Sequence, residues 1–142
     1  MPTSEPEEIL DPDLPICDPH HHLWDFPNAR YLLDELLADT GSGHRIESTV
    51  FVECTAFYRA GVPPQQAFVG ETEFVNGVAA MSASGRYGET RACAGIVGRA
   101  DLAGADVDAA LAAHVRAGNG RFRGIRHAGA WDASPDIREA HT

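Results

Sequence analysis

The sequence predicts an α/β fold built on a parallel sheet, and three observations support this prediction. Short segments rich in β-branched and aromatic residues alternate with longer segments of helical periodicity, in the order strand, helix, strand, helix, strand, helix, strand. A helix between successive strands is the connection that parallel strands require. Polar side chains follow several strands at their carboxyl ends, which is where parallel α/β proteins bind ligands.

Four strands and three helices are expected, in a domain that spans residues 15–142. The strands lie at residues 16–18, 48–54, 91–98 and 122–127, and the helices at 30–39, 66–83 and 101–116. Residues 1–14 are acidic and proline-rich, which predicts a flexible lead-in. Pro19 should end the first strand because proline cannot donate to the ladder. In the last helix the core-facing residues should be Leu102, Val107, Leu111 and Val115.

Composition limits the classes of function. The net charge is −10, which argues against nucleic-acid and anionic-membrane partners because both need basic patches. Every basic residue is arginine, so no lysine nucleophile or carbamylated lysine is present. Cys17, Cys54 and Cys93 are widely spaced and fall within or at the end of apolar runs, which predicts buried free thiols. No secretory leader or membrane span is visible, and we expect a reducing cytoplasm.

The stretch ICDPHHHLWD carries the main candidate site. In an extended chain, residues two apart point to the same side, so His20 and His22 should face one site and His21 should point elsewhere. Two imidazoles can bind one divalent cation, although a catalytic metal site normally has three protein ligands and an open position. We expect Zn²⁺, Mn²⁺ or Fe²⁺ there. Asp18 should orient one imidazole rather than bind the metal.

Other polar residues at strand ends are further candidates. Arg126 can hold a substrate carboxylate bidentately or form an internal ion pair with Glu53, which would be costly to bury unpaired. His127 can act as an acid, base or hydrogen-bond donor, or be structural. Trp24 and Tyr58 either wall a substrate pocket or only pack. No role is assigned to His44, His114 or His141.

ICDPHHHLWD resembles the first-strand signature of the amidohydrolase-2 group of the amidohydrolase superfamily. VFVECTAFY, GETEFVNGVAAMSASG, AGIVGRADL and FRGIRHAGAWD resemble the next segments of that group in order. The resemblance implies a (β/α)8 TIM barrel with its active site at the carboxyl ends of the strands, and an enzyme that opens a lactone or a related cyclic ester or amide. It implies that His20 and His22 bind a divalent metal, Zn²⁺ or Mn²⁺. In some lactonases of the group these histidines instead act on the substrate without metal.

The length of the chain predicts only part of such a barrel. A TIM barrel needs roughly 250 residues, so we expect the N-terminal half, with about four strands. The later histidine and aspartate of the family site have no counterpart, and we expect this chain alone to be inactive. The expected partner is a small molecule, a carboxylated lactone by preference. Three alternatives stay open: a complete small α/β domain, a non-oxidative decarboxylase of the superfamily, and a non-catalytic half-barrel that self-associates through exposed edges.

Overall fold

The computed structural model describes residues 8–129 and 132–134. Its main feature is a parallel sheet with the strand order β1-β4-β5-β6. The four strands are β1 (Ile16–His21), β4 (Ile46–Val52), β5 (Arg91–Arg99) and β6 (Phe122–Arg126). A separate antiparallel hairpin contains β2 (Trp24–Phe26) and β3 (Ala29–Tyr31), and the helices are α1 (Leu33–Thr40), α2 (Pro64–Ala67), α3 (Val69–Ala83) and α4 (Val107–Ala117). The predicted parallel α/β class is confirmed. Residues 1–7 of the predicted lead-in and residues 135–142 of the predicted domain, including His141, lie outside the described residues.

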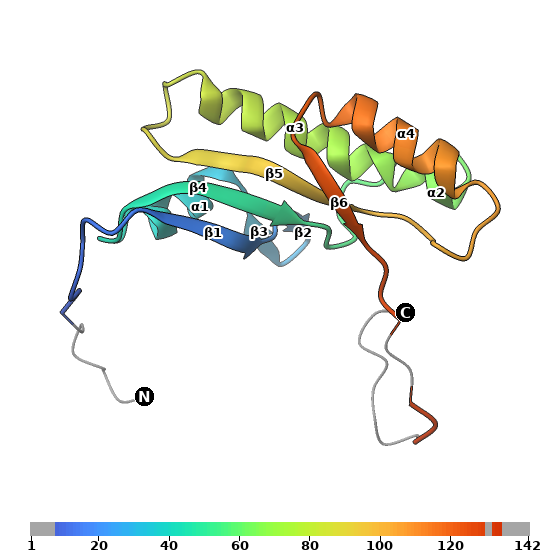
Figure 1. The fold of residues 1–142 in the computed structure, drawn as a ribbon, viewed down its shortest axis with the longest axis horizontal. Helices are drawn as coiled ribbons and strands as arrows, with labels where there is room; N and C mark the ends of the chain where they lie inside the picture. Colours follow the sequence, from blue (N-terminus) through green and yellow to red (C-terminus); the bar gives the residue numbers. More distant parts are fainter. Residues whose placement is uncertain (1–7, 130–131, 135–142) are drawn as a thin grey trace.

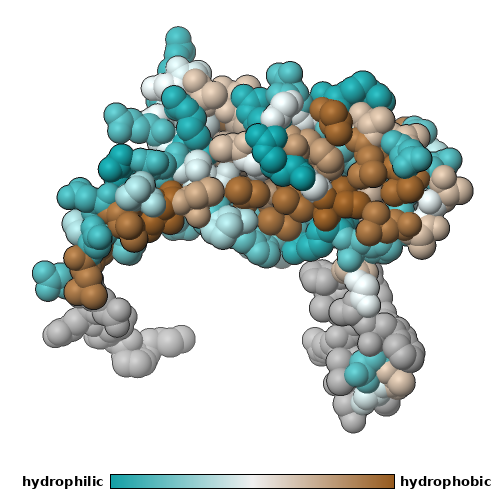
Figure 2. Space-filling model, in the orientation of Figure 1, coloured by the Kyte–Doolittle hydropathy of each residue, from teal (hydrophilic) through white to brown (hydrophobic). Residues whose placement is uncertain are grey.

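Helices α3 and α4 lie side by side on one side of the sheet, where α3 packs on β5 (Figure 1). Within the described chain, β1 and β6 each have a neighbouring strand on one side only, so these strands form an open sheet. Figure 2 shows, in the same orientation, a band of apolar residues at the level of the strands. This arrangement brings the carboxyl ends of all four strands to one edge.

The core lies between the sheet and helices α1 and α3. Helix α3 contributes Val75, Val78 and Ala79, which recur at helical spacing, and the sheet contributes Phe51 and Ile96. The rest of the buried cluster is Leu23, Leu33, Leu36, Ala92 and Cys93. The strand predicted at 91–98 is one residue longer, and the strand predicted at 48–54 begins and ends two residues earlier.

Strand β1 does not end at Pro19, as the sequence analysis expected, but continues to His21. Asp18 pairs with Thr49 and His21 with Phe51, so three residue steps on β1 match two on β4. Such a bulge tolerates Pro19, because the residue inserted at a bulge does not have to donate an N–H to the neighbouring strand. Because β1 is an edge strand among the described residues, its other side has no partner strand to lose.

The helix predicted from residue 30 begins only at Leu33, because residues 29–31 form β3. The carboxylate of Glu35 accepts a hydrogen bond from the backbone N–H of Leu32 at 2.8 Å, which fixes the helix start there. Arg30 contacts Glu35 at 3.4 Å from outside the helix. The charge pattern that suggested an earlier start therefore comes from hairpin–helix contacts.

Helix α4 also starts later than predicted and buries a different face. Residues 101–106 turn instead, with the Asp101 carboxylate accepting the N–H of Ala103 at 3.0 Å. The predicted core residues Leu102 and Val115 are exposed, whereas Ala110 and His114 are buried. Hydrophobic periodicity misplaced this face because the helix buries an alanine and a hydrogen-bonded histidine, not its largest apolar residues.

His114 is fully buried and links three elements. One ring nitrogen, Nδ1, lies 2.8 Å from the hydroxyl of Thr72 on α3, and Nε2 lies 2.9 Å from the carbonyl oxygen of Arg99 on β5. Its ring stacks on Phe122 of β6, with centroids 5.3 Å apart. Burial lowers the pKa of His114, so the neutral ring donates to Arg99 and accepts from Thr72.

The three cysteines are free, but only Cys93 is fully buried. Cys54 is half-buried and Cys17 is exposed on β1, so the expectation of three buried thiols is wrong for Cys17. Its strand lies at the sheet edge, where an apolar pattern does not ensure burial. Among the helices in the described ranges, none is long and apolar enough to cross a membrane.

Candidate functional site

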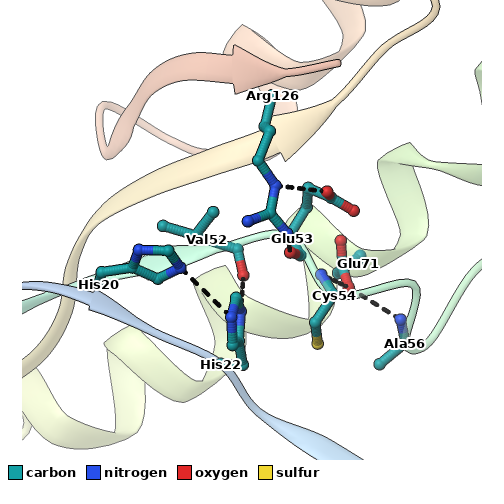
Figure 3. Close-up of polar contacts among 8 residues, drawn as sticks. All are labelled: His20, His22, Val52, Glu53, Cys54, Ala56, Glu71 and Arg126. Carbon is teal, nitrogen blue, oxygen red and sulfur yellow. Dashed lines mark hydrogen bonds and ion pairs between the residues drawn. The ribbon is translucent and has the colours of Figure 1, made fainter. Parts of the chain in front are cut away.

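The candidate site lies at the carboxyl edge of the sheet, where β1, β4 and β6 end close together (Figure 3). His20 and His22 come from the end of β1 and the residue after it. Glu53 follows β4 directly, and Arg126 is the last residue of β6. The parallel topology explains this gathering, because successive strands present their carboxyl ends on the same side.

The predicted pairing of His20 with His22 is confirmed. Their Nε2 atoms lie 3.3 Å apart, and their rings are nearly perpendicular at 87°. The Nδ1 atom of His22 lies 2.8 Å from the carbonyl oxygen of Val52, so Nδ1 carries the proton and donates it. The Nε2 lone pair of His22 therefore points toward His20, where it can accept a hydrogen bond or bind a cation.

His21 points the other way, as predicted, and anchors the segment in the core. Its Nε2 lies 2.8 Å from the Thr49 hydroxyl, and its ring packs edge-on against Phe51. Burial lowers the pKa of His21, so the neutral form is favoured. Alternation along β1 therefore separates a core histidine from the two histidines at the site.

Asp18 does not orient an imidazole, contrary to the prediction. Its carboxylate accepts the backbone N–H of His20 at 3.1 Å and so stabilises the bulged backbone. The group that orients His22 is the main-chain carbonyl of Val52, thirty residues away. A backbone carbonyl leaves no mark in the side-chain pattern, so the sequence could not identify it.

Glu53 and Arg126 form the ion pair that the sequence analysis considered. The Nε atom of Arg126 donates to Glu53 Oε1 at 2.8 Å, and Nη2 donates to the main-chain oxygen of Glu53. The side chain of Glu53 is 4% exposed and that of Arg126 is 30% exposed. Neither described contact uses Nη1, so Arg126 can still offer that nitrogen to a carboxylate.

Glu71 is a buried member of this region that the sequence analysis did not single out. One carboxylate oxygen accepts the backbone N–H groups of Cys54 and Ala56, at 3.0 and 2.9 Å. These contacts fasten the loop after β4, in which Thr55 and Phe57 both have positive φ angles. The sequence signal was a carboxylate at an apolar position of α3.

The charge state of Glu71 follows from its burial. It is 1% exposed, and its Oε2 meets no hydrogen-bond partner in the described structure. Burial is the main cause that raises the pKa of Glu71 to about 7, with Glu53 adding repulsion and the two backbone donors acting against it. Burial thus brings the titration of Glu71 close to neutral pH.

The other predicted site residues lie in separate surroundings. Trp24 stacks on Tyr31 within the hairpin, with ring centroids 5.2 Å apart. Tyr58 packs against Phe68, and burial raises the pKa of its phenol. The exposed His127 accepts the backbone N–H of Leu102 at 3.0 Å through Nδ1. Within the described residues, none of these three side chains hydrogen-bonds to or stacks on His20 or His22, and their roles remain predictions.

A cavity of about 1020 Å³ also lies apart from the histidine pair. It is bounded by α2, the start of α3, the loop after β5 and one face of α4, and His127 is the one predicted site residue that lines it. This cavity thus does not contribute a substrate pocket to His20 and His22.

The donor set at the histidine pair fits half of a metal site. Two nitrogens bound to one tetrahedral Zn²⁺ at 2.0–2.1 Å lie about 3.3–3.4 Å apart, which matches the Nε2–Nε2 distance. Over residues 8–129 and 132–134, no three His, Cys, Asp or Glu side chains group so that they could hold a metal. His20 and His22 can therefore supply two ligands, and further ligands have to come from water, substrate or other residues.

Comparison of the chain with protein-family models, curated proteins and solved structures finds no match. The family resemblance accordingly rests on the sequence motifs, and the site is interpreted from its own geometry.

Proposed function

We propose that this chain contributes the first part of the active site of an amidohydrolase-type hydrolase, in the N-terminal half of a (β/α)8 barrel. The reaction is the opening of a lactone or a related cyclic ester or amide. The observation that carries the proposal is the histidine pair, whose Nε2 atoms converge at 3.3 Å while a backbone carbonyl fixes the tautomer of His22. Convergent, pre-oriented imidazoles at a strand end are suited to holding a cation or a polarised carbonyl.

A divalent ion held by His20 and His22 would act as a Lewis acid toward the substrate carbonyl. Two groups of the chain itself support this site. The Val52 carbonyl holds the proton on Nδ1 of His22, so that its Nε2 remains a ligand. His21 anchors the strand through Thr49, which keeps its two neighbours on the site side.

Arg126 is the proposed contact for a substrate carboxylate. Glu53 already engages Nε and Nη2, which leaves Nη1 for the substrate and fixes the plane of the guanidinium. This supports a single-point contact in place of the bidentate one expected from sequence. A carboxylated lactone is therefore the preferred substrate class.

The test measures lactone opening and bound metal in the protein expressed from its intact gene, with Zn²⁺ or Mn²⁺ supplied. We expect His20→Ala and His22→Ala each to reduce both turnover and metal content to background. His44→Ala is the matched control, because His44 is exposed and lies in the turn before β4. It should retain both.

Two results would contradict parts of this proposal. Turnover that survives in both His20→Ala and His22→Ala would remove the pair from the reaction. If the wild-type enzyme is active without bound metal and both variants are inactive, the histidines would take part in the reaction but the cation would not.

A further inference from the structure

We propose that the cavity between α2, α3 and α4 is a second ligand site, which binds a small organic carboxylate with an apolar body through Arg99. The cavity measures about 1020 Å³, a volume at the upper end of typical small-molecule pockets. It contains neither His20 nor His22, so this inference does not depend on the proposed hydrolase activity.

The walls of the cavity favour an apolar ligand body. Phe68 and Val69 line it from the α2–α3 junction, and Ala110 and Ala113 line it from α4. Phe68 and Ala113 are half-buried, so part of their apolar surface is accessible to a ligand, whereas Val69 and Ala110 are almost fully buried. Small-molecule sites combine walls of this kind with a few charged or polar groups that fix orientation.

Arg99 supplies the charge. Its guanidinium carbon lies 5.3 Å from the centroid of the Phe68 ring, and both side chains line the cavity. Arg99 is half-buried, and no carboxylate contacts its guanidinium in the part of the chain that the structure describes. The half-buried Arg126, by contrast, is paired with Glu53, and Arg121 donates to the Asn76 side chain at 2.7 Å.

This difference suggests an anionic ligand. A partly buried charge is costly unless an opposite charge or hydrogen bonds compensate it. The Phe68 ring compensates Arg99 from one side only, and the buried hydroxyl of Tyr58 makes no hydrogen bond within the described residues. A planar carboxylate matches the guanidinium fork and would complete its compensation.

The remaining charges of the cavity are largely engaged or exposed. Arg59 donates to Glu73 at 2.9 Å through Nε. Asp101 accepts the N–H of Ala103, and its Oδ1 lies 3.8 Å from Nε2 of His127. Asp106 and Arg116 are exposed, where solvent screens them. Arg99 is thus the cation best placed to fix a ligand inside the cavity.

The test is calorimetric binding of benzoate and of its neutral analogue benzamide to the whole protein. We expect saturable binding of benzoate and much weaker binding of benzamide. Arg99→Met should weaken benzoate binding roughly 10- to 100-fold, the effect of losing a charge-assisted hydrogen bond. Arg91→Met is the matched control, since Arg91 is exposed at the opposite end of the same strand, and it should bind benzoate like the wild type.

A second variant makes the result independent of the folding of Arg99→Met. Ala113→Trp places a large ring on the cavity wall while keeping Arg99, and it should abolish benzoate binding. Equal binding of benzoate and benzamide would overturn the proposal, as would unchanged benzoate affinity in either variant. Inorganic phosphate that displaces benzoate at equal affinity would also overturn it, because the apolar walls would then contribute nothing.

Discussion

At the scale of single residues, Glu71 shows how burial decides a charge state. Its Oε1 holds two backbone N–H groups of the loop after β4, while its Oε2 is buried without a described partner. Backbone donors favour the carboxylate, but burial favours the neutral acid, and burial is the larger effect. The loop beside the candidate site is therefore held by a group that titrates near neutrality.

Replacement of Glu71 by glutamine should flatten the pH dependence of stability. The folded-state pKa is raised from 4.5 to about 7, so the native protein binds a proton that the unfolded chain lacks, and stability falls as pH rises through this interval. Glutamine keeps the acceptor for both backbone donors and never ionises. The free energy of unfolding of Glu71→Gln, relative to that of the wild type, should rise by on the order of 2–3 kcal/mol between pH 5 and pH 8.

Urea unfolding at a series of pH values measures this effect. Glu73→Gln is the control on the same helix, because the pKa of Glu73 is lowered by its hydrogen bond to Arg59 and its pH dependence has the opposite sign. Parallel stability curves for wild type and Glu71→Gln would show that Glu71 does not titrate in this interval.

Sequence reasoning succeeded for residues whose role follows from periodicity. Alternation alone placed His20 and His22 together and His21 in the opposite direction. It failed for Glu71 and His114, which occupy buried helical positions as polar residues. Their burial is compensated by backbone groups distant in sequence, and a hydrophobic pattern contains no information about such partners.

At the scale of elements, Gly98 on β5 allows α3 and α4 to approach the sheet. A Cβ atom at this position would lie 3.0 Å from the His114 ring and 3.1 Å from the Thr72 hydroxyl. The His114 ring is fixed by two hydrogen bonds and a stacked ring, so it cannot easily move away. The packing of three elements thus depends on the absence of one methyl group.

We expect Gly98→Ala to destabilise the fold by about 1–3 kcal/mol, the typical effect of overpacking a core. Gly124→Ala on β6 is the matched control, because a Cβ there would meet no atom within 4 Å. Its effect should be near zero or slightly stabilising, since alanine restricts the unfolded chain. Denaturant midpoints of the two variants measure the difference, and equal midpoints would contradict the crowding argument.

Element type was predictable, but element ends were less so. The four strands of the parallel sheet and the long helix α3 appear where β-branched runs and helical spacing placed them, whereas the hairpin strands β2 and β3 were not predicted. The starts of α1 and α4 shifted because side-chain carboxylates accept backbone N–H groups near them. Glu35 accepts the N–H of Leu32 and caps α1 there, and Asp101 accepts the N–H of Ala103 in a turn before α4. These bonds depend on local geometry that residue type alone does not specify.

At the scale of the whole molecule, the Glu53–Arg126 pair joins the ends of β4 and β6 across β5, between residues 73 positions apart. The two partners differ in exposure, at 4% for the Glu53 side chain and 30% for that of Arg126. Water can hydrate Arg126 if its partner is lost, but it reaches Glu53 poorly. Loss of the arginine should therefore be the more harmful change.

We expect Arg126→Met to destabilise the protein by about 2–4 kcal/mol and Glu53→Met by about 1–2 kcal/mol. The double variant should be more stable than the sum of the two effects implies, because no buried charge is then left unpaired. A double-mutant cycle in urea unfolding measures this coupling. Equal effects of the single changes, or strict additivity, would show that the pair does not act as a unit.

The sequence by itself determined the parallel α/β class, the alternation of the four sheet strands with α1, α3 and α4, and the strand-end positions of His20, His22, Glu53 and Arg126. These features follow from the local periodicity of apolar residues and from the order in which the predicted segments occur along the chain. Only the tertiary structure decided the tautomer of His22, the use of Arg126 by Glu53, the buried roles of Glu71 and His114, and the cavity at Arg99. Each depends on contacts between residues far apart in sequence, whose distances and burial arise only when the elements pack.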